Sequence, residues 1–261
     1  MSREFTVAAA DTRLHGVDTP GEEPPLLFLN GAFSTQRHWK PVIGRLGGRY
    51  RTVTFDARGR GRSGPSSDYS IRGAIEDVDR VIGATVLRRP ILVGWSHGAT
   101  VAVCYAAEYP QLVGGLVLID GACPVSLLDE AGKEGVRRQF RGLGRIMRVL
   151  AFFGRSARMS PSDSAEVVIE TDIVNGELGA DFETLRCPTV FVLGADRRPG
   201  VSVREAGTMR AAAAQAVAGN EQVSVFATTA GSDPRILAGD PGAVVAAIEE
   251  VRKRSGHVTG V

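Results

Sequence analysis

The stretch ILVGWSHGAT, residues 91–100, decides the fold class of this chain. It begins with an apolar run of strand length, and residues 98–108 that follow have the pattern of a helix. Ser96 lies between the two, flanked by Gly94 and Gly98 in a G-x-S-x-G pattern. Glycines there leave room for a sharp turn, and the helix points its first N–H groups at the serine. The stretch therefore predicts a strand–turn–helix unit that presents Ser96 as a nucleophile.

Strand and helix patterns alternate along the rest of the chain. We expect further strands within residues 25–31, 51–56, 112–120, 187–196 and 222–227, and helices over 70–86, 203–217 and 241–253. Residues 5–18, FTVAAADTRLHGVD, are typical of an antiparallel hairpin at a sheet edge. Such alternation predicts an α/β fold, with a mostly parallel sheet that helices cover on both faces.

One segment interrupts this alternation. Residues 124–182 contain helical patterns but no strand pattern, where a connection of a few residues is usual. We interpret them as a helical cap over the carboxyl ends of the strands, where open α/β sheets bind their ligands. The predicted domains are a core of residues 1–123 and 183–261 and a cap of residues 124–182. A purely structural insertion is the alternative interpretation.

Four motifs together resemble the α/β-hydrolase fold superfamily, over nearly the whole chain. They are LLFLNGAF at 26–33, VTFDARGRGRSG at 53–64, ILVGWSHGATVA at 91–102 and LRCPTVFVLGADRRPG at 185–200. The resemblance implies an eight-stranded, mostly parallel sheet with helices on both faces and the cap inserted after strand 6. It also implies that a serine nucleophile, an acid and a histidine follow one another in that chain order. A small organic acyl substrate is expected, and no cofactor.

The resemblance assigns roles to five residues. Ser96 would attack an acyl carbon once a base accepts its proton. The backbone N–H of His97, together with that of Ala32 or Phe33, would form the oxyanion hole. Asp196 would orient the histidine and stabilise its imidazolium. A turn residue without chemistry is the alternative interpretation of both Ser96 and Asp196.

The triad histidine is missing from its expected place. Residues 230–232 read AGS where the family pattern has alanine, glycine and histidine, and the C-terminal helix pattern follows from residue 241. Ser232 therefore occupies the histidine position. A hydroxyl group cannot accept the proton of Ser96 near neutral pH, so efficient turnover would need another base. No histidine occurs between Gly98 and Gly256.

Other residues could substitute, although each has a plainer interpretation. His97 adjoins Ser96, but neighbouring side chains on a tight turn point apart, so we expect its ring at the start of the helix. The remaining candidates are His38 after the oxyanion loop, His15 in the edge hairpin, His257 in the polar tail, Asp233 beside a turn proline and, as a substitute acid, Asp120 at a strand end.

Three functions stay open. The first is a hydrolase of a small ester, lactone, thioester or related acyl substrate, with Ser96 attacking and an unusual base. The second is a lyase, cyclase or isomerase that polarises its substrate without an acyl-enzyme. The third is a ligand-binding pseudo-hydrolase. The intact GWSHG motif and Asp196 favour retained chemistry, so we predict the hydrolase.

Composition argues against several other classes. The 261 residues are 43% hydrophobic and 23% charged, as in ordinary globular proteins. A net charge of +2 with dispersed arginines predicts no nucleic-acid partner, and the lack of a long apolar window predicts no membrane span. Three cysteines and four histidines without ligand spacing predict no metal site. The first residues lack a signal-peptide pattern, so a cytoplasmic location is expected. A homodimer stays open.

Overall fold

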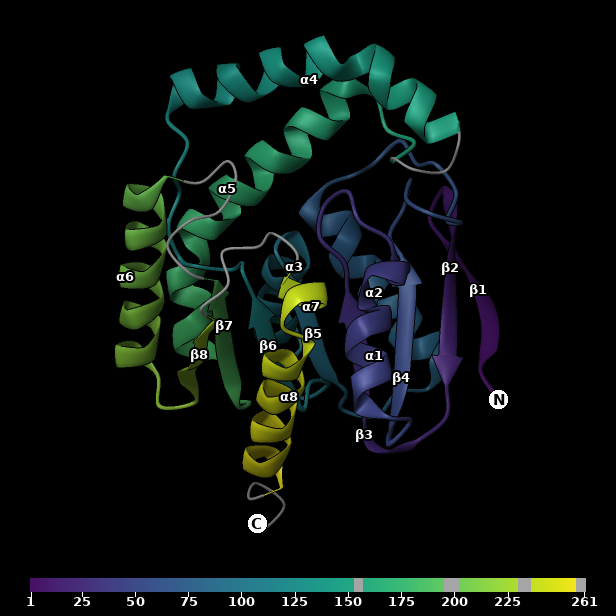
Figure 1. Cartoon of the computed structure of the whole chain (residues 1–261), viewed down its shortest axis with the longest axis vertical. Helices are drawn as coiled ribbons and strands as arrows, with labels where there is room; N and C mark the ends of the chain where they lie inside the picture. The colour runs from purple at the N-terminus through teal and green to yellow at the C-terminus, as the bar shows by residue number, and fades with distance from the viewer. Residues whose placement is uncertain (153–156, 195–201, 230–235, 257–261) are drawn as a thin grey trace.

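The computed structural model describes residues 1–152, 157–194, 202–229 and 236–256, with the backbone alone over 144–152 and 227–229. These residues form one eight-stranded sheet in the order β1-β2-β4-β3-β5-β6-β7-β8 (Figure 1). The strands are β1 (Arg3–Ala9), β2 (Thr12–Thr19), β3 (Glu22–Leu29), β4 (Tyr50–Asp56), β5 (Ile91–Trp95), β6 (Gly115–Ile119), β7 (Thr189–Gly194) and β8 (Val223–Thr229). β2 pairs antiparallel with β1 and β4, and all other pairs are parallel. The predicted α/β fold class is confirmed.

Helices cover both faces of this sheet. They are α1 (Lys40–Leu46), α2 (Ile71–Thr85), α3 (His97–Glu108), α4 (Glu130–Phe152), α5 (Pro161–Thr184), α6 (Val203–Gly219), α7 (Ile236–Gly239) and α8 (Pro241–Ser255), with a short 3-10 helix at Gln36–Trp39. In β3, Leu27 and Leu29 enter the core shared with α2 and α3, while Leu26 and Phe28 enter the core shared with α1 and α8. Burial on both faces explains why the central strands are continuous apolar runs.

The central strands bring three chain segments to one edge of the sheet. β5 lies between β3 and β6, with Leu29 opposite Gly94 and Trp95 opposite Ile119. The loop after β3, the turn after β5 and the residues after β6 are therefore neighbours. This is the edge at which parallel α/β sheets place their ligand sites.

Residues 124–182 supply α4 and most of α5, and the described part of this segment contains no strand. Both helices lie at the edge where the parallel strands end, with α4 outermost and α5 reaching down beside the sheet (Figure 1). We call α4 and α5 the insertion helices. The division into a core and a cap domain at residues 123/124 and 182/183 stays a prediction.

Element bounds differ from the predicted ones in a few places. The strand expected from residue 112 begins at Gly115, because residues 109–112 form a turn in which the N–H of Leu112 donates to the carbonyl of Tyr109. α1 was not predicted, since its seven residues include a proline and a glycine and are too short for a periodic pattern. No helix in the described part of the chain combines the length and the apolar character that crossing a membrane requires.

Candidate functional site

Ser96 occupies the turn between β5 and α3. Its backbone has φ 53° and ψ -119°, a combination that non-glycine residues rarely adopt. Its N–H donates to the carbonyl of Ile119 at 2.8 Å, which ties the turn to the end of β6. The residue itself is exposed. The structure thus holds the Ser96 side chain outward on a strained backbone that its neighbours stabilise.

Three glycines allow the backbone to close around this turn. A Cβ on Gly98 would lie 2.3 Å from the carbonyl oxygen of Leu29, and one on Gly94 would lie 2.4 Å from the carbonyl oxygen of Gly98. A Cβ on Gly121 would lie 2.3 Å from the carbonyl oxygen of Ser96. The G-x-S-x-G pattern identifies the first two glycines. Gly121 was missed, because its only signal is a glycine shortly after a buried strand.

The loop after β3 lies alongside Trp95, the residue before Ser96. A Cβ on Gly31 would be 3.2 Å from the Trp95 ring, and the Ser34 N–H closes the loop onto the Gly31 carbonyl at 3.1 Å. Among the described residues, no hydrogen bond uses the backbone N–H of Ala32 or Phe33. The N–H of His97 is equally unused there, as the first of α3. The oxyanion role of these three groups stays a prediction.

The ring of His97 is buried at the start of α3 and hydrogen-bonded to a side chain of α5. Its Nδ1 lies 2.9 Å from the Oγ1 of Thr171, whose own proton goes to the carbonyl of Val167 at 2.6 Å. Nδ1 must therefore donate, which places the proton of the neutral ring on that nitrogen. Burial and, secondarily, the charge of Arg60 lower the pKa of His97 to about 3. Such a pKa is poorly matched to a general base at neutral pH.

His38 lies nearer to the turn than its sequence position indicates. Its ring centroid is 6.1 Å from that of Trp95, and its Nδ1 lies 3.1 Å from the carbonyl oxygen of Thr35. His15, in contrast, belongs to β2, where its Nδ1 meets Gln36 at 3.1 Å. Of these two histidines, His38 is the one that the fold brings beside the Ser96 turn.

Several predicted site residues fall outside the described residues. They are Asp196, Ser232, Asp233 and His257. Asp120, the alternative acid, is described: its N–H donates to the carbonyl of Val192 at 3.0 Å, and its Oδ1 accepts from the N–H of Gly194 at 2.6 Å. These two bonds join the ends of β6 and β7, which agrees with the strand-end interpretation.

The loop between β4 and α2 is fixed by its own motif residues. Arg58 donates to both carboxylate oxygens of Asp77, at 2.9 and 2.7 Å, and Ser63 donates to the carbonyl of Asp56. Asp56 in turn accepts the N–H groups of Gln36 and Arg62, each at 2.9 Å. These motif residues therefore hold the loop in its shape.

One residue of the same loop was missed by the sequence reasoning. Arg60 donates from Nε to the carbonyl of Ala32 at 2.7 Å, so it supports the loop that carries the expected oxyanion donors. The signal available in the sequence is a single arginine between two glycines, Gly59 and Gly61. That pattern gives no indication of which carbonyl the side chain reaches.

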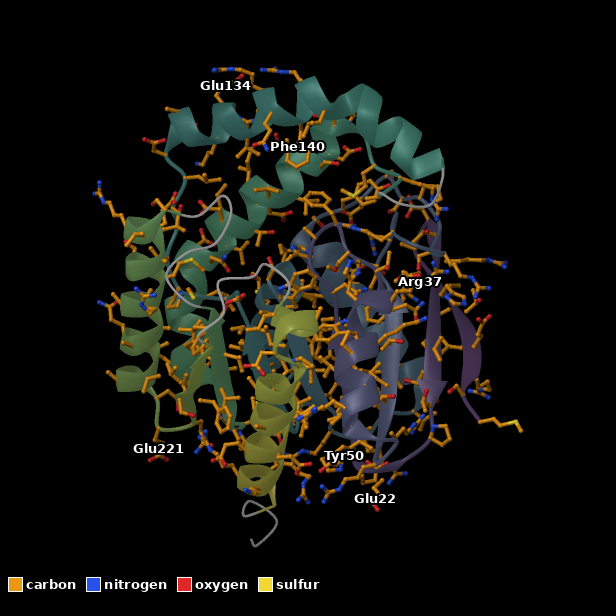
Figure 2. All side chains as sticks on the ribbon, viewed as in Figure 1. Glu22, Arg37, Tyr50, Glu134, Phe140 and Glu221 are labelled. Atoms are coloured by element: carbon orange, nitrogen blue, oxygen red, sulfur yellow. The ribbon has the colours of Figure 1, made fainter. Side chains whose placement is uncertain are left out.

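A groove lies away from the Ser96 turn. It has a volume of about 560 Å³ and runs over β2 and β4, and its lining includes His15, Gln36, Thr54 and Arg37 but not Ser96. Arg37 stands on this side of the molecule in Figure 2. No group of three or more possible metal ligands occurs among the described residues.

Comparisons with known proteins agree with this architecture. The model of the Alpha/beta hydrolase family matches residues 26–248. A 2-(acetamidomethylene)succinate hydrolase of Mesorhizobium japonicum is 37% identical over 101 residues, which cover 38% of this chain and 36% of that protein. The chain thus spans about two-fifths of the length of the curated relatives that it matches.

Two solved structures share the fold at low identity. A bromoperoxidase from Bacillus anthracis superposes with a TM-score of 0.76 at 17% identity, covering 96% of this chain and 100% of that one. A thermophilic esterase from Thermogutta terrifontis superposes with a TM-score of 0.71 at 21% identity, covering 98% of this chain and 99% of that one. At these identities the likeness establishes the fold alone.

Proposed function

Because the chain belongs to the alpha/beta hydrolase family, we propose that it hydrolyses a small ester, lactone, thioester or related acyl substrate with Ser96 as the nucleophile. The observation that carries the proposal is the Ser96 turn. Its backbone at φ 53° stores strain that packing at Gly98 and Gly121 maintains, and strain of this kind clusters at functional sites.

In the proposed reaction, the Ser96 oxygen adds to the acyl carbon and its proton passes to a base. The carbonyl oxygen becomes an oxyanion that accepts from the N–H of His97 and from that of Ala32 or Phe33. The alcohol or thiol leaves with a proton, and water then hydrolyses the acyl-enzyme. The free N–H groups in the described loop and at the start of α3 support this assignment.

The proposed triad is atypical, with Asp196 as the acid and Ser232 in the histidine position. A pKa of about 3 makes His97 an unsuitable replacement. The carboxylate of Asp120 accepts a hydrogen bond from the N–H of Gly194 and so links the ends of β6 and β7. His38 beside Trp95 is the substitute base that we would test first.

The insertion helices act as the cap in this proposal. Ala157, Met159 and Val167 form an apolar cluster against Ala32 and Tyr69. Phe140 of α4 contacts Phe33 with ring centroids 5.5 Å apart, and Figure 2 shows Phe140 between α4 and the rest of the molecule. An apolar roof beside the oxyanion loop favours an organic acyl substrate. The hydrolase name of the Mesorhizobium relative is consistent with that class.

A second candidate function follows from the presence of a serine at position 232. Without a histidine there, the oxyanion donors could polarise a substrate for a lyase, cyclase or isomerase, or the site could only bind a ligand. Both alternatives leave Ser96 unactivated, so its reactivity separates them from the hydrolase.

A fluorophosphonate probe tests the proposal, because it reacts with an activated serine. We expect the wild-type protein to be labelled and Ser96→Ala to lose labelling entirely, while Ser67→Ala, at an exposed serine elsewhere, stays labelled. A wild-type protein that resists the probe would exclude the hydrolase. His38→Ala measures the contribution of the substitute base, and Ser232→His should raise ester hydrolysis if the remaining machinery is intact.

A further inference from the structure

Arg60 is a buried cation that has no direct ion pair among the described residues, and the carboxylate whose charge acts on it, that of Asp77, is bound to Arg58. The residue is 4% exposed, and no carboxylate among the described residues lies within ion-pair distance of its guanidinium. Burial lowers the pKa of Arg60 to about 10, so the side chain still carries its charge at neutral pH. Burying a charge is costly unless it is paired. The arrangement is therefore one that an external anion would complete.

Its two neighbouring arginines are paired. Arg58 has an ion pair with Asp77 at 2.7 Å and a second one with Asp68 at 3.1 Å. Arg62, which is exposed, pairs with Glu4 at 2.6 Å. The fold thus brings carboxylates to the arginine on either side of Arg60, from α2 to Arg58 and from β1 to Arg62. Of the three arginines compared, Arg60 alone has no ion pair within the part of the chain that the structure describes.

The guanidinium of Arg60 keeps donors free on one side. Nε donates to the carbonyl of Ala32 and Nη1 to that of Arg58, each at 2.7 Å. An arginine has five N–H donors, so both protons of Nη2 and one of Nη1 remain. The enclosed side-chain atoms that lack a partner in the described residues are Thr12 Oγ1 and His15 Nε2. Since Nη2 is not among them and no bond from it occurs in the described residues, it keeps some solvent-accessible surface.

The free donors lie beside the expected oxyanion loop. The carbonyl of Ala32 holds the guanidinium, and the charge lies close enough to His97 to lower its pKa. The ring of Tyr69 lies under the guanidinium, with its centroid 5.7 Å from Cζ. Tyr69 and Ala32 also pack against the apolar cluster of Ala157, Met159 and Val167. A cation in such apolar surroundings attracts an anion more strongly than one in water.

We propose that Arg60 binds a carboxylate of the substrate, so that the acyl compound attacked by Ser96 carries a free carboxylate group. One free N–H on each of Nη1 and Nη2 matches the two oxygens of a carboxylate in a fork-to-fork pair. The attack by Ser96 in this proposal rests on the proposed function, whereas the binding of a carboxylate by Arg60 does not. Arg60 is a specificity-determining residue here, with no part in proton transfer.

Equilibrium binding tests the proposal without requiring turnover. Monomethyl succinate, glutarate and adipate are titrated by calorimetry into Ser96→Ala, each beside its dimethyl ester as the neutral counterpart. We expect one or more monoesters to bind at least about tenfold more tightly than the matching diester, because a hydrogen bond to a charged group is worth about that much. Equal affinities for all three pairs would overturn the proposal.

Variants at Arg60 assign the preference to this side chain. In Ser96→Ala/Arg60→Met the monoester preference should vanish, while Ser96→Ala/Arg62→Met, in the same loop, should retain it. A preference that survives Arg60→Met would overturn the assignment. Arg60 also supports Ala32, so a purely structural loss would weaken monoester and diester alike and leave their ratio unchanged. If Arg60→Met does not fold, Arg60→Lys should keep the charge but reduce the preference by losing the fork.

The two proposals fail separately. A protein that prefers the monoesters yet resists the fluorophosphonate probe keeps the carboxylate site and loses the hydrolase. A protein that is labelled at Ser96 but shows no preference keeps the hydrolase and loses the role of Arg60.

Discussion

The insertion helices α4 and α5 are consecutive in the chain, but the molecule holds them differently. α5 is embedded through apolar side chains that are at most 3% exposed, namely Val167, Ile169, Leu178 and Phe182. The described side chains of α4 are half-buried or exposed. Among the described side chains of α4, one ion pair reaches α5, Arg137–Glu166, whereas Lys133–Glu130 and Arg141–Glu134 lie within α4 itself. Surface pairs contribute little to stability.

The contacts that the two helices make with the site differ in the same way. On α5, Thr171 bonds the ring of His97, and the side-chain oxygen of Asn175 accepts the hydroxyl of Thr100 at 2.8 Å. Both partners are buried residues of α3. α4 reaches the expected oxyanion loop through the Phe140–Phe33 contact. We infer that α5 is part of the rigid scaffold of the site, whereas α4 is the part that can adjust to a substrate at lower cost.

The largest expected effect comes from a matched pair of phenylalanines. Phe182 of α5 is 1% exposed and contacts Phe191, with centroids 5.4 Å apart. Phe182→Ala leaves a cavity in the core and should lower the free energy of unfolding by about 3–5 kcal/mol. Phe140→Ala on α4 should cost only about 1 kcal/mol, since that ring is half-buried. Denaturant unfolding measures both, and equal losses would contradict the contrast between the helices.

A pH-dependent effect is expected where α5 meets α3. His97 has a pKa of about 3 in the folded protein, against about 6.5 in the unfolded chain. Between these values the unfolded chain binds a proton that the folded protein does not, so stability falls as the pH drops. For this group the loss between pH 7 and pH 5 is about 2 kcal/mol.

His97→Gln should remove that share of the pH dependence, as measured by urea unfolding at the two pH values. Thr100→Val is the matched control, because it removes the neighbouring α3–α5 hydrogen bond without removing a titrating group. The control should lower stability equally at both pH values. A His97→Gln protein with the full wild-type slope would show that folding does not lower the pKa of His97.

The smallest expected effect concerns two helical glycines. A Cβ on Gly135 of α4 meets nothing within 4 Å, so Gly135→Ala should stabilise the protein by about 0.5–1 kcal/mol. A Cβ on Gly176 of α5 would lie 3.0 Å from the Cβ of Ser126, so Gly176→Ala should gain less or lose stability. Thermal unfolding followed by circular dichroism compares them. A larger gain at Gly176 would reverse the expected order.

Sequence patterns predicted the core strands and helices well, because the signals for them act between residues that are close in the chain. Leu26, Leu27, Phe28 and Leu29 alternate between two cores, which makes their strand a continuous apolar run. Ser70 caps α2 by accepting the N–H of Gly73, and Asp240 caps α8 by accepting that of Ala243. Each of these signals operates within a few residues, so it is visible in the chain itself.

The sequence by itself determined the sheet, the insertion and the turn that presents Ser96, because apolar periodicity and the space that glycine provides are local properties. Only the tertiary structure decided the state of His97 and Arg60. The tautomer of His97 depends on Thr171, 74 residues away in the chain. Arg60 has no direct ion pair among the described residues because the fold places Asp77 within ion-pair distance of Arg58 and farther from Arg60. Burial and partners are decided by residues far apart in the chain, so local patterns cannot reveal them.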